Sequence, residues 1–113
     1  MNIEAKVIEY LQTALGTDEV YAEVPEGLSV EFYVVDKTGG TMRDWIKSST
    51  IAIQTYGPSK LRASEMNEAV KEAMYNFDTL DEIGGCHLNS DYNFTNTAKR
   101  QHRYQSVWDI THY

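Results

Sequence analysis

The chain has 113 residues and a mass of 12.9 kDa, which is the size of one domain spanning residues 1–113. Hydrophobic residues make up 42% of the chain and charged residues 24%, a composition that argues against disorder. No apolar run approaches the roughly 18 residues that a membrane span needs. The acidic N-terminus does not match a secretory signal, and the single cysteine, Cys86, excludes an internal disulfide.

The net charge of −7 belongs to the first third of the chain. Residues 1–36 contain Lys6 as their only base, whereas residues 37–113 contain equal numbers of acids and bases. The acids of the first third are Glu4, Glu9, Asp18, Glu19, Glu23, Glu26, Glu31 and Asp36. A surface of this sign repels nucleic acid and anionic membranes, so we expect neither to adhere to this part of the protein.

The first third is predicted to form a helix and two strands. Apolar residues at steps of three and four predict a helix over residues 2–15, which Asn2 caps and which Gly16 ends in a left-handed conformation. A short strand is expected over residues 20–24. A stronger strand follows over residues 30–37, where apolar and polar side chains alternate.

A long connection is predicted after this strand. Gly39-Gly40 suits a turn with positive φ, and the next strand is expected over residues 49–56. The connection over residues 38–48 is long for a hairpin, and long connections are often functional or bind partners. It also carries Met42 and Trp45, two apolar side chains in an otherwise polar segment.

The second half of the chain is predicted to form a helix and two strands. Helical spacing of apolar residues extends from Leu61 or Arg62 to Phe77. Residues 84–94 and 103–112 alternate, so we expect two strands joined by a turn over residues 96–100. In the first of these strands, one face is expected to hold Cys86, Leu88, Ser90, Tyr92 and Phe94, and the other His87, Asn89, Asp91 and Asn93.

The element order α-β-β-β-α-β-β predicts an α+β fold. Helices at the two breaks in a run of hairpin-connected strands favour a mostly antiparallel sheet with two helices packed on one face. A domain this small is marginally stable as a monomer, so an oligomer would gain stability.

No specific catalytic or metal-binding motif is present. The spacings of His87, His102, His112 and Cys86 match no zinc pattern, and Cys86 and His87 would point to opposite faces of a strand. Gly39-Gly40 lacks the Lys-Ser/Thr of a phosphate loop. We therefore expect no enzyme activity, no cofactor and no metal.

The only basic patch covers residues 99–103. Such a patch, followed by Tyr104, can contact phosphates or a stacked base, or it can be a solvated hairpin turn. The acidic net charge favours the turn.

An ordered set of short motifs runs through residues 20–75. It consists of Val24-Pro25, a valine-rich strand ending in Thr38-Gly39-Gly40, then Arg43-Asp44, a strand with Gln54 and Tyr56, and an alanine-rich helix. In this order the motifs resemble the small tail-completion and tail-terminator proteins of long-tailed bacteriophages and prophages. Those proteins often carry Arg-Pro soon after Val-Pro, and residues 26–30 depart from that pattern.

The resemblance implies a non-enzymatic assembly protein. Members form a ring, commonly of six subunits, that caps the tail tube, ends its polymerisation and joins it to the head connector. The implied partners are further copies of the chain, the tail tube protein and a head connector or neck protein. The implied locations are the bacterial host cytoplasm during assembly and then the virion. DNA would only pass through the channel of the ring. If the acidic first third lines that channel, its negative charge would keep the DNA from adhering; the alternative is that the acidic first third forms an outer face.

The connection after the second strand is the predicted interface, because exposed aromatic groups in polar segments mark interfaces. We expect docking on a neighbouring subunit or on the tail tube by Thr38, Gly39, Gly40, Thr41, Met42, Arg43, Asp44 and Trp45. Arg43 and Asp44 would then set the register through polar contacts. The alternative is that Trp45 begins the next strand and packs in the core.

Two other functions fit the sequence. A head-closure or neck adaptor protein belongs to the same class, and its partner in a pull-down would distinguish it from a terminator. A small ligand-binding or regulatory module belongs to a different class, and its pocket would be lined by Tyr92, Tyr104 and Trp108.

Overall fold

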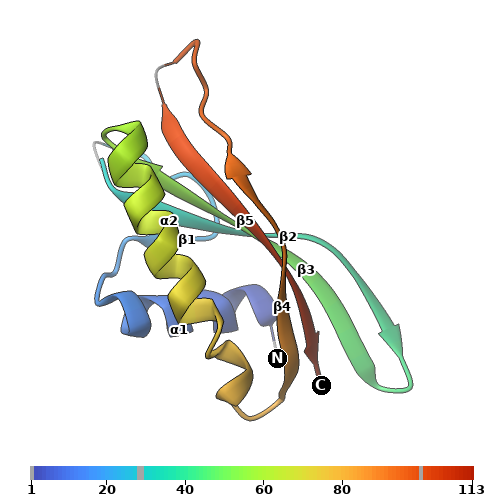
Figure 1. The fold of residues 1–113 in the computed structure, drawn as a ribbon. Coiled ribbons are helices and arrows are strands. Elements are labelled where there is room, and N and C mark those ends of the chain that lie inside the picture. The colour runs from blue at the N-terminus through green and yellow to red at the C-terminus, as the bar shows by residue number, and fades with distance from the viewer. Residues whose placement is uncertain (1, 28–29, 100) are drawn as a thin grey trace.

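A computed structural model describes residues 2–27, 30–99 and 101–113. Leu28 and Ser29 lie outside the described residues, and so does Arg100, which belongs to the predicted basic patch. Across the described ranges the chain forms two α-helices, α1 (Ile3–Leu15) and α2 (Lys60–Met74), and one five-stranded sheet (Figure 1). The strands are β1 (Val20–Tyr21), β2 (Phe32–Arg43), β3 (Ile46–Gly57), β4 (Ile83–Asn93) and β5 (His102–His112). A 3-10 turn, η1 (Phe77–Thr79), precedes β4, and the predicted element order is confirmed.

The strands lie in the order β1-β2-β3-β5-β4. The pairings of β2 with β3, β3 with β5 and β4 with β5 are antiparallel, whereas the short β1 pairs with β2 in parallel. Because α2 carries the chain across the sheet, β5 can return between β3 and β4. The predicted mostly antiparallel sheet is confirmed.

Both helices pack on one face of the sheet, as predicted (Figure 1). The Asn2 side chain accepts from the Ala5 N–H at the start of α1, and Gly16 ends it at φ 66°. Helix α2 is capped by Ser59 and ends before Phe77, which begins η1 and is fully buried. The core on this face is formed mainly by Ile3, Val7, Leu11, Tyr33, Val35, Ile51, Ile53, Met66, Val70, Met74, Phe77, Trp108 and Ile110.

The other face of the sheet carries no helix. It holds a small apolar cluster in which the rings of Phe32 and Tyr56 stack with centroids 4.4 Å apart, with Val34 beside them. At this end β3 passes close to α2, since a Cβ on Gly57 would lie 2.8 Å from the backbone N of Ala63. Glycine is therefore required here by the approach of two backbones.

The predicted long connection over residues 38–48 is wrong. Strands β2 and β3 pair continuously to Arg43 and Ile46, with one register shift between Lys37 and Gly39. The two glycines of the expected turn lie within β2, and the actual turn is Asp44-Trp45. Cross-strand hydrogen bonds therefore override the local turn preference of the glycine pair.

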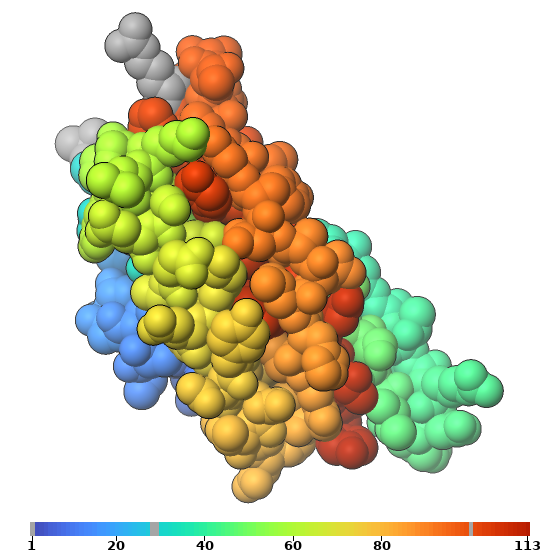
Figure 2. Space-filling model, in the orientation of Figure 1, coloured from blue at the N-terminus to red at the C-terminus, as the bar shows by residue number. Residues whose placement is uncertain are grey.

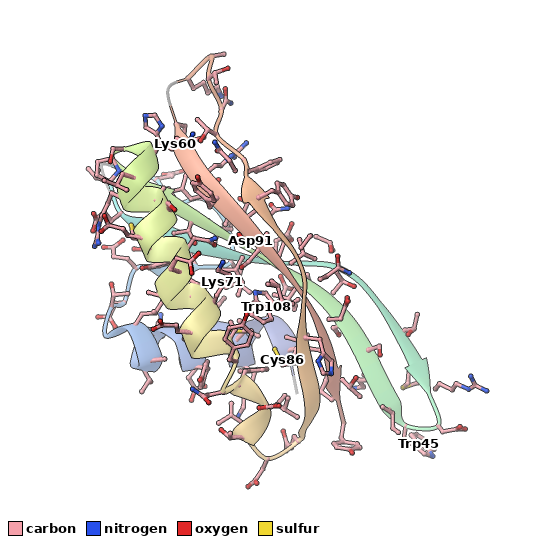
Figure 3. All side chains as sticks on the ribbon, in the orientation of Figure 1. Trp45, Lys60, Lys71, Cys86, Asp91 and Trp108 are labelled. Atoms are coloured by element: carbon pink, nitrogen blue, oxygen red, sulfur yellow. The ribbon has the colours of Figure 1, made fainter. Side chains whose placement is uncertain are left out.

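The predicted alternation in β4 holds only for its first half. A register shift between Leu88 and Ser90 inserts an extra residue, so the later side chains exchange faces. Asp91 consequently faces α2, where Asn67 Nδ2 donates to Asp91 Oδ1 at 2.6 Å and Lys71 Nζ to Asp91 Oδ2 at 2.7 Å (Figure 3). These bonds hold α2 to β4.

Candidate interaction surface: the β2–β3 arm

The far half of the β2–β3 hairpin, residues 38–48, extends to one side of the molecule beyond the helices, and we call it the arm (Figures 1 and 2). Its β3 strand stays paired with β5 at Lys47 and Ser48. The first four residues of β2 are buried, and every residue from Asp36 to Arg43 is exposed. Strand β1 covers the outer edge of β2 only at Tyr33 and Val34. Within the described residues the arm therefore presents an open strand edge, a surface that readily pairs with another chain.

The tip of the arm is a two-residue turn with an unusual residue in it. Asp44 and Trp45 both have positive φ, 50° and 68°, as hairpin turns of this length require. Glycine is preferred at the second position, and a tryptophan in the left-handed region costs roughly 1–2 kcal/mol. Trp45 recovers nothing by burial, because its side chain is 85% exposed (Figure 3). The expectation that it packs in the core is wrong, and the folding of one copy does not account for it.

The register of the arm places an apolar group and a cation on each of its faces. Met42 pairs with Lys47 on one face, and Arg43 with Ile46 on the other. Met42 is 63% exposed and Ile46 42%. Within the described part of the chain, neither Arg43 nor Lys47 forms an ion pair. The tip thus combines exposed apolar area with a small excess of positive charge, since Arg43 and Lys47 outnumber Asp44.

The structure brings all the predicted interface residues together on the arm. Thr38 lies at the register shift, where its hydroxyl donates to the Thr50 carbonyl at 3.4 Å. The remaining residues follow in the ladder and the turn. Ile46 belongs to the same surface. It follows Trp45 directly and lies within the predicted connection over residues 38–48, which is expected to bind partners.

A buried polar contact anchors the base of the arm. Ser49 Oγ and His112 Nε2 lie 2.8 Å apart, and His112 is only 2% exposed. Burial lowers the pKa of His112, and the nearby charges of Lys47 and Lys37 lower it further. The neutral imidazole therefore ties β3 to β5 just below the point where the arm leaves the body.

The remaining candidate groups lie away from the arm and have structural surroundings. Cys86 is buried and His87 exposed, on opposite faces of β4 as predicted. Burial raises the pKa of the Cys86 thiol to about 12, with a smaller contribution from Asp78, so the nucleophilic thiolate is scarce at neutral pH.

The aromatic pocket expected for a ligand-binding module does not form. Trp108 is fully buried on the helix-covered face, where Ser106 accepts from its indole N–H. Tyr92 lies opposite Gln105 on the other face and accepts a hydrogen bond from it. Two residues on opposite faces of a sheet cannot line one pocket.

The chain was compared with known proteins. It matches no protein-family model, and no curated protein matches it. Among solved structures it is similar to a chain in the virion of a native gene transfer agent particle, with a TM-score of 0.70 and 15% sequence identity over 97% of this chain and 93% of that chain. The two chains therefore share a fold over nearly their whole lengths. In the described residues, no helix is long and apolar enough to cross a membrane.

Proposed function

We propose that this protein is a non-enzymatic assembly protein of a phage-like particle, where it forms a ring on the end of the tail tube. The ring stops further polymerisation of the tube and presents a surface to the head connector. The protein acts in the bacterial host cytoplasm during assembly and stays in the virion. Two findings support this: the fold shared with a gene transfer agent virion chain, and the motif order that resembles tail-completion proteins.

The observation that carries the proposal is the arm. Trp45 is 85% exposed in a backbone conformation that disfavours tryptophan, so packing within one copy does little to offset the strain of the turn. Burial of the indole against a partner would offset it. The open edge of β2 and the exposed side chains of Met42 and Ile46 extend the same surface. Burial of such a surface against a neighbouring subunit or the tail tube stabilises a small domain.

Light scattering on a sizing column, over a range of protein concentrations, tests the ring. We expect a mass about six times 12.9 kDa, or a monomer that converts to it as concentration rises. A monomer at every concentration would favour a neck adaptor or a regulatory module. A pull-down then separates the two ring-forming functions: a terminator binds the tail tube protein, whereas a neck adaptor binds a protein on the portal side.

A further inference from the structure

The arm has a complementary surface at the other end of the same molecule. The arm, residues 38–48, carries two cations and one acid, whereas residues 18–26 carry four acids and no base. The second segment contains β1, which pairs with β2 at Tyr33 and Val34, and continues beyond Tyr21. Opposite charges on two surfaces of one chain favour contact between copies.

The segment from Tyr21 to Glu26 lines a hollow of about 460 Å³, which we call the acidic hollow. Val24 lies in its wall and is 52% exposed, so it adds apolar area to the hollow. Glu23 and Glu26 are also exposed, and neither forms an ion pair within the described ranges. The hollow therefore offers apolar area and negative charge together, the converse of the arm tip.

One copy cannot place its arm in its own hollow. Tyr21 pairs with Val34 near the start of β2, whereas Trp45 follows the end of that strand. At about 3.3 Å per residue the two points lie roughly 30 Å apart, and Figure 1 shows the arm and β1 at opposite ends of the strand. A second copy must supply the arm, in a head-to-tail contact that leaves a free hollow on the copy that supplies the arm and a free arm on the copy that receives it. Contacts of this type close into a ring when the rotation allows it.

We infer that Trp45 of one copy occupies the acidic hollow of the next, with Arg43 and Lys47 facing Glu23 and Glu26. This inference rests on the proposed ring and names the surfaces that build it. The indole and Val24 supply the apolar contact, and the charge pairs fix which way round the arm enters.

Charge reversal tests the pairing. The arm variant Arg43→Glu/Lys47→Glu and the hollow variant Glu23→Lys/Glu26→Lys each place like charges in contact, so we expect each alone to lose the oligomeric mass. Mixing the two variants, or combining all four substitutions in one chain, restores opposite charges at every contact and should restore the mass. The control Lys60→Glu/Lys99→Glu makes the same change in net charge as the arm variant, at exposed positions outside the residues of both surfaces, and should assemble like the original chain. Circular dichroism melting checks that every variant is folded.

The outcomes separate this inference from the proposed function. An original chain that forms a ring, with variants that keep the ring or that fail to recover on mixing, overturns the inference and leaves the ring intact. An original chain that stays monomeric at every concentration overturns both. Loss in each variant and recovery in the mixture supports the arm-in-hollow contact.

Discussion

Replacing Trp45 by glycine should weaken assembly without weakening the fold. The substitution relieves a left-handed tryptophan, worth about 1–2 kcal/mol, and gives up about 0.4–1 kcal/mol because glycine has more freedom in the unfolded chain. The side chain is 85% exposed, so little burial is lost. We therefore expect Trp45→Gly to raise the free energy of unfolding of the monomer by about 0–1.6 kcal/mol, while the concentration needed for assembly rises.

The second tryptophan of the chain provides the matched control. Trp108 is fully buried under α2 (Figure 3), and Trp108→Ala should cost about 3–5 kcal/mol. Urea titration followed by circular dichroism, at a concentration where the protein is monomeric, measures both changes. If Trp45→Gly lowers the free energy of unfolding of the monomer by more than about 1 kcal/mol, Trp45 packs on its own copy, and a partner is not needed to offset the strain of the turn.

The remaining predictions concern groups that hold the body together. Burial and the charges of Lys47 and Lys37 lower the pKa of His112 below 6.5. As the pH falls through that value the unfolded chain therefore binds more protons than the folded one, so the free energy of unfolding should decline below about pH 6.5. His112→Gln should flatten this decline in melts between pH 7 and 5. Lys71→Met leaves the Asp91 carboxylate, which is 26% exposed, without its ion pair and should lower the free energy of unfolding, measured in urea, by about 1–3 kcal/mol. Adding Asp91→Asn to the Lys71→Met variant should recover part of this loss. A thiol reagent should modify Cys86 at neutral pH only after unfolding, since burial raises its pKa to about 12; fast modification of the native protein would contradict the buried position.

Local signals were sufficient for much of the fold. The caps at Asn2 and Gly16 and the spacing of apolar residues predict α1 almost to the residue. Alternation predicts where most strands lie, because burial on one face imposes a period of two. The run of elements then predicts an α+β sheet with helices on one face, and the apolar pair in a polar segment predicts the surface that protrudes as the arm.

Local signals failed where a distant segment decides the conformation. The local sequence Gly39-Gly40 predicts a turn, but the ladder between β2 and β3 continues past it because Thr50 and Ser49 of β3 supply the cross-strand partners. The extra residue near Ser90 reverses the later half of β4, and only the registration against β5 reveals it. The positive φ of Trp45 and its distance from the acidic hollow likewise depend on how far two strands stay paired.

The sequence by itself determined the elements, the ends of α1, the buried faces of most elements and the uneven distribution of charge, because each depends on neighbours within a few residues. The tertiary structure decided the strand order, the length of the arm and the placement of acids and bases at opposite ends of β2. These features depend on hydrogen bonds and packing between segments tens of residues apart, which no local pattern of side chains specifies.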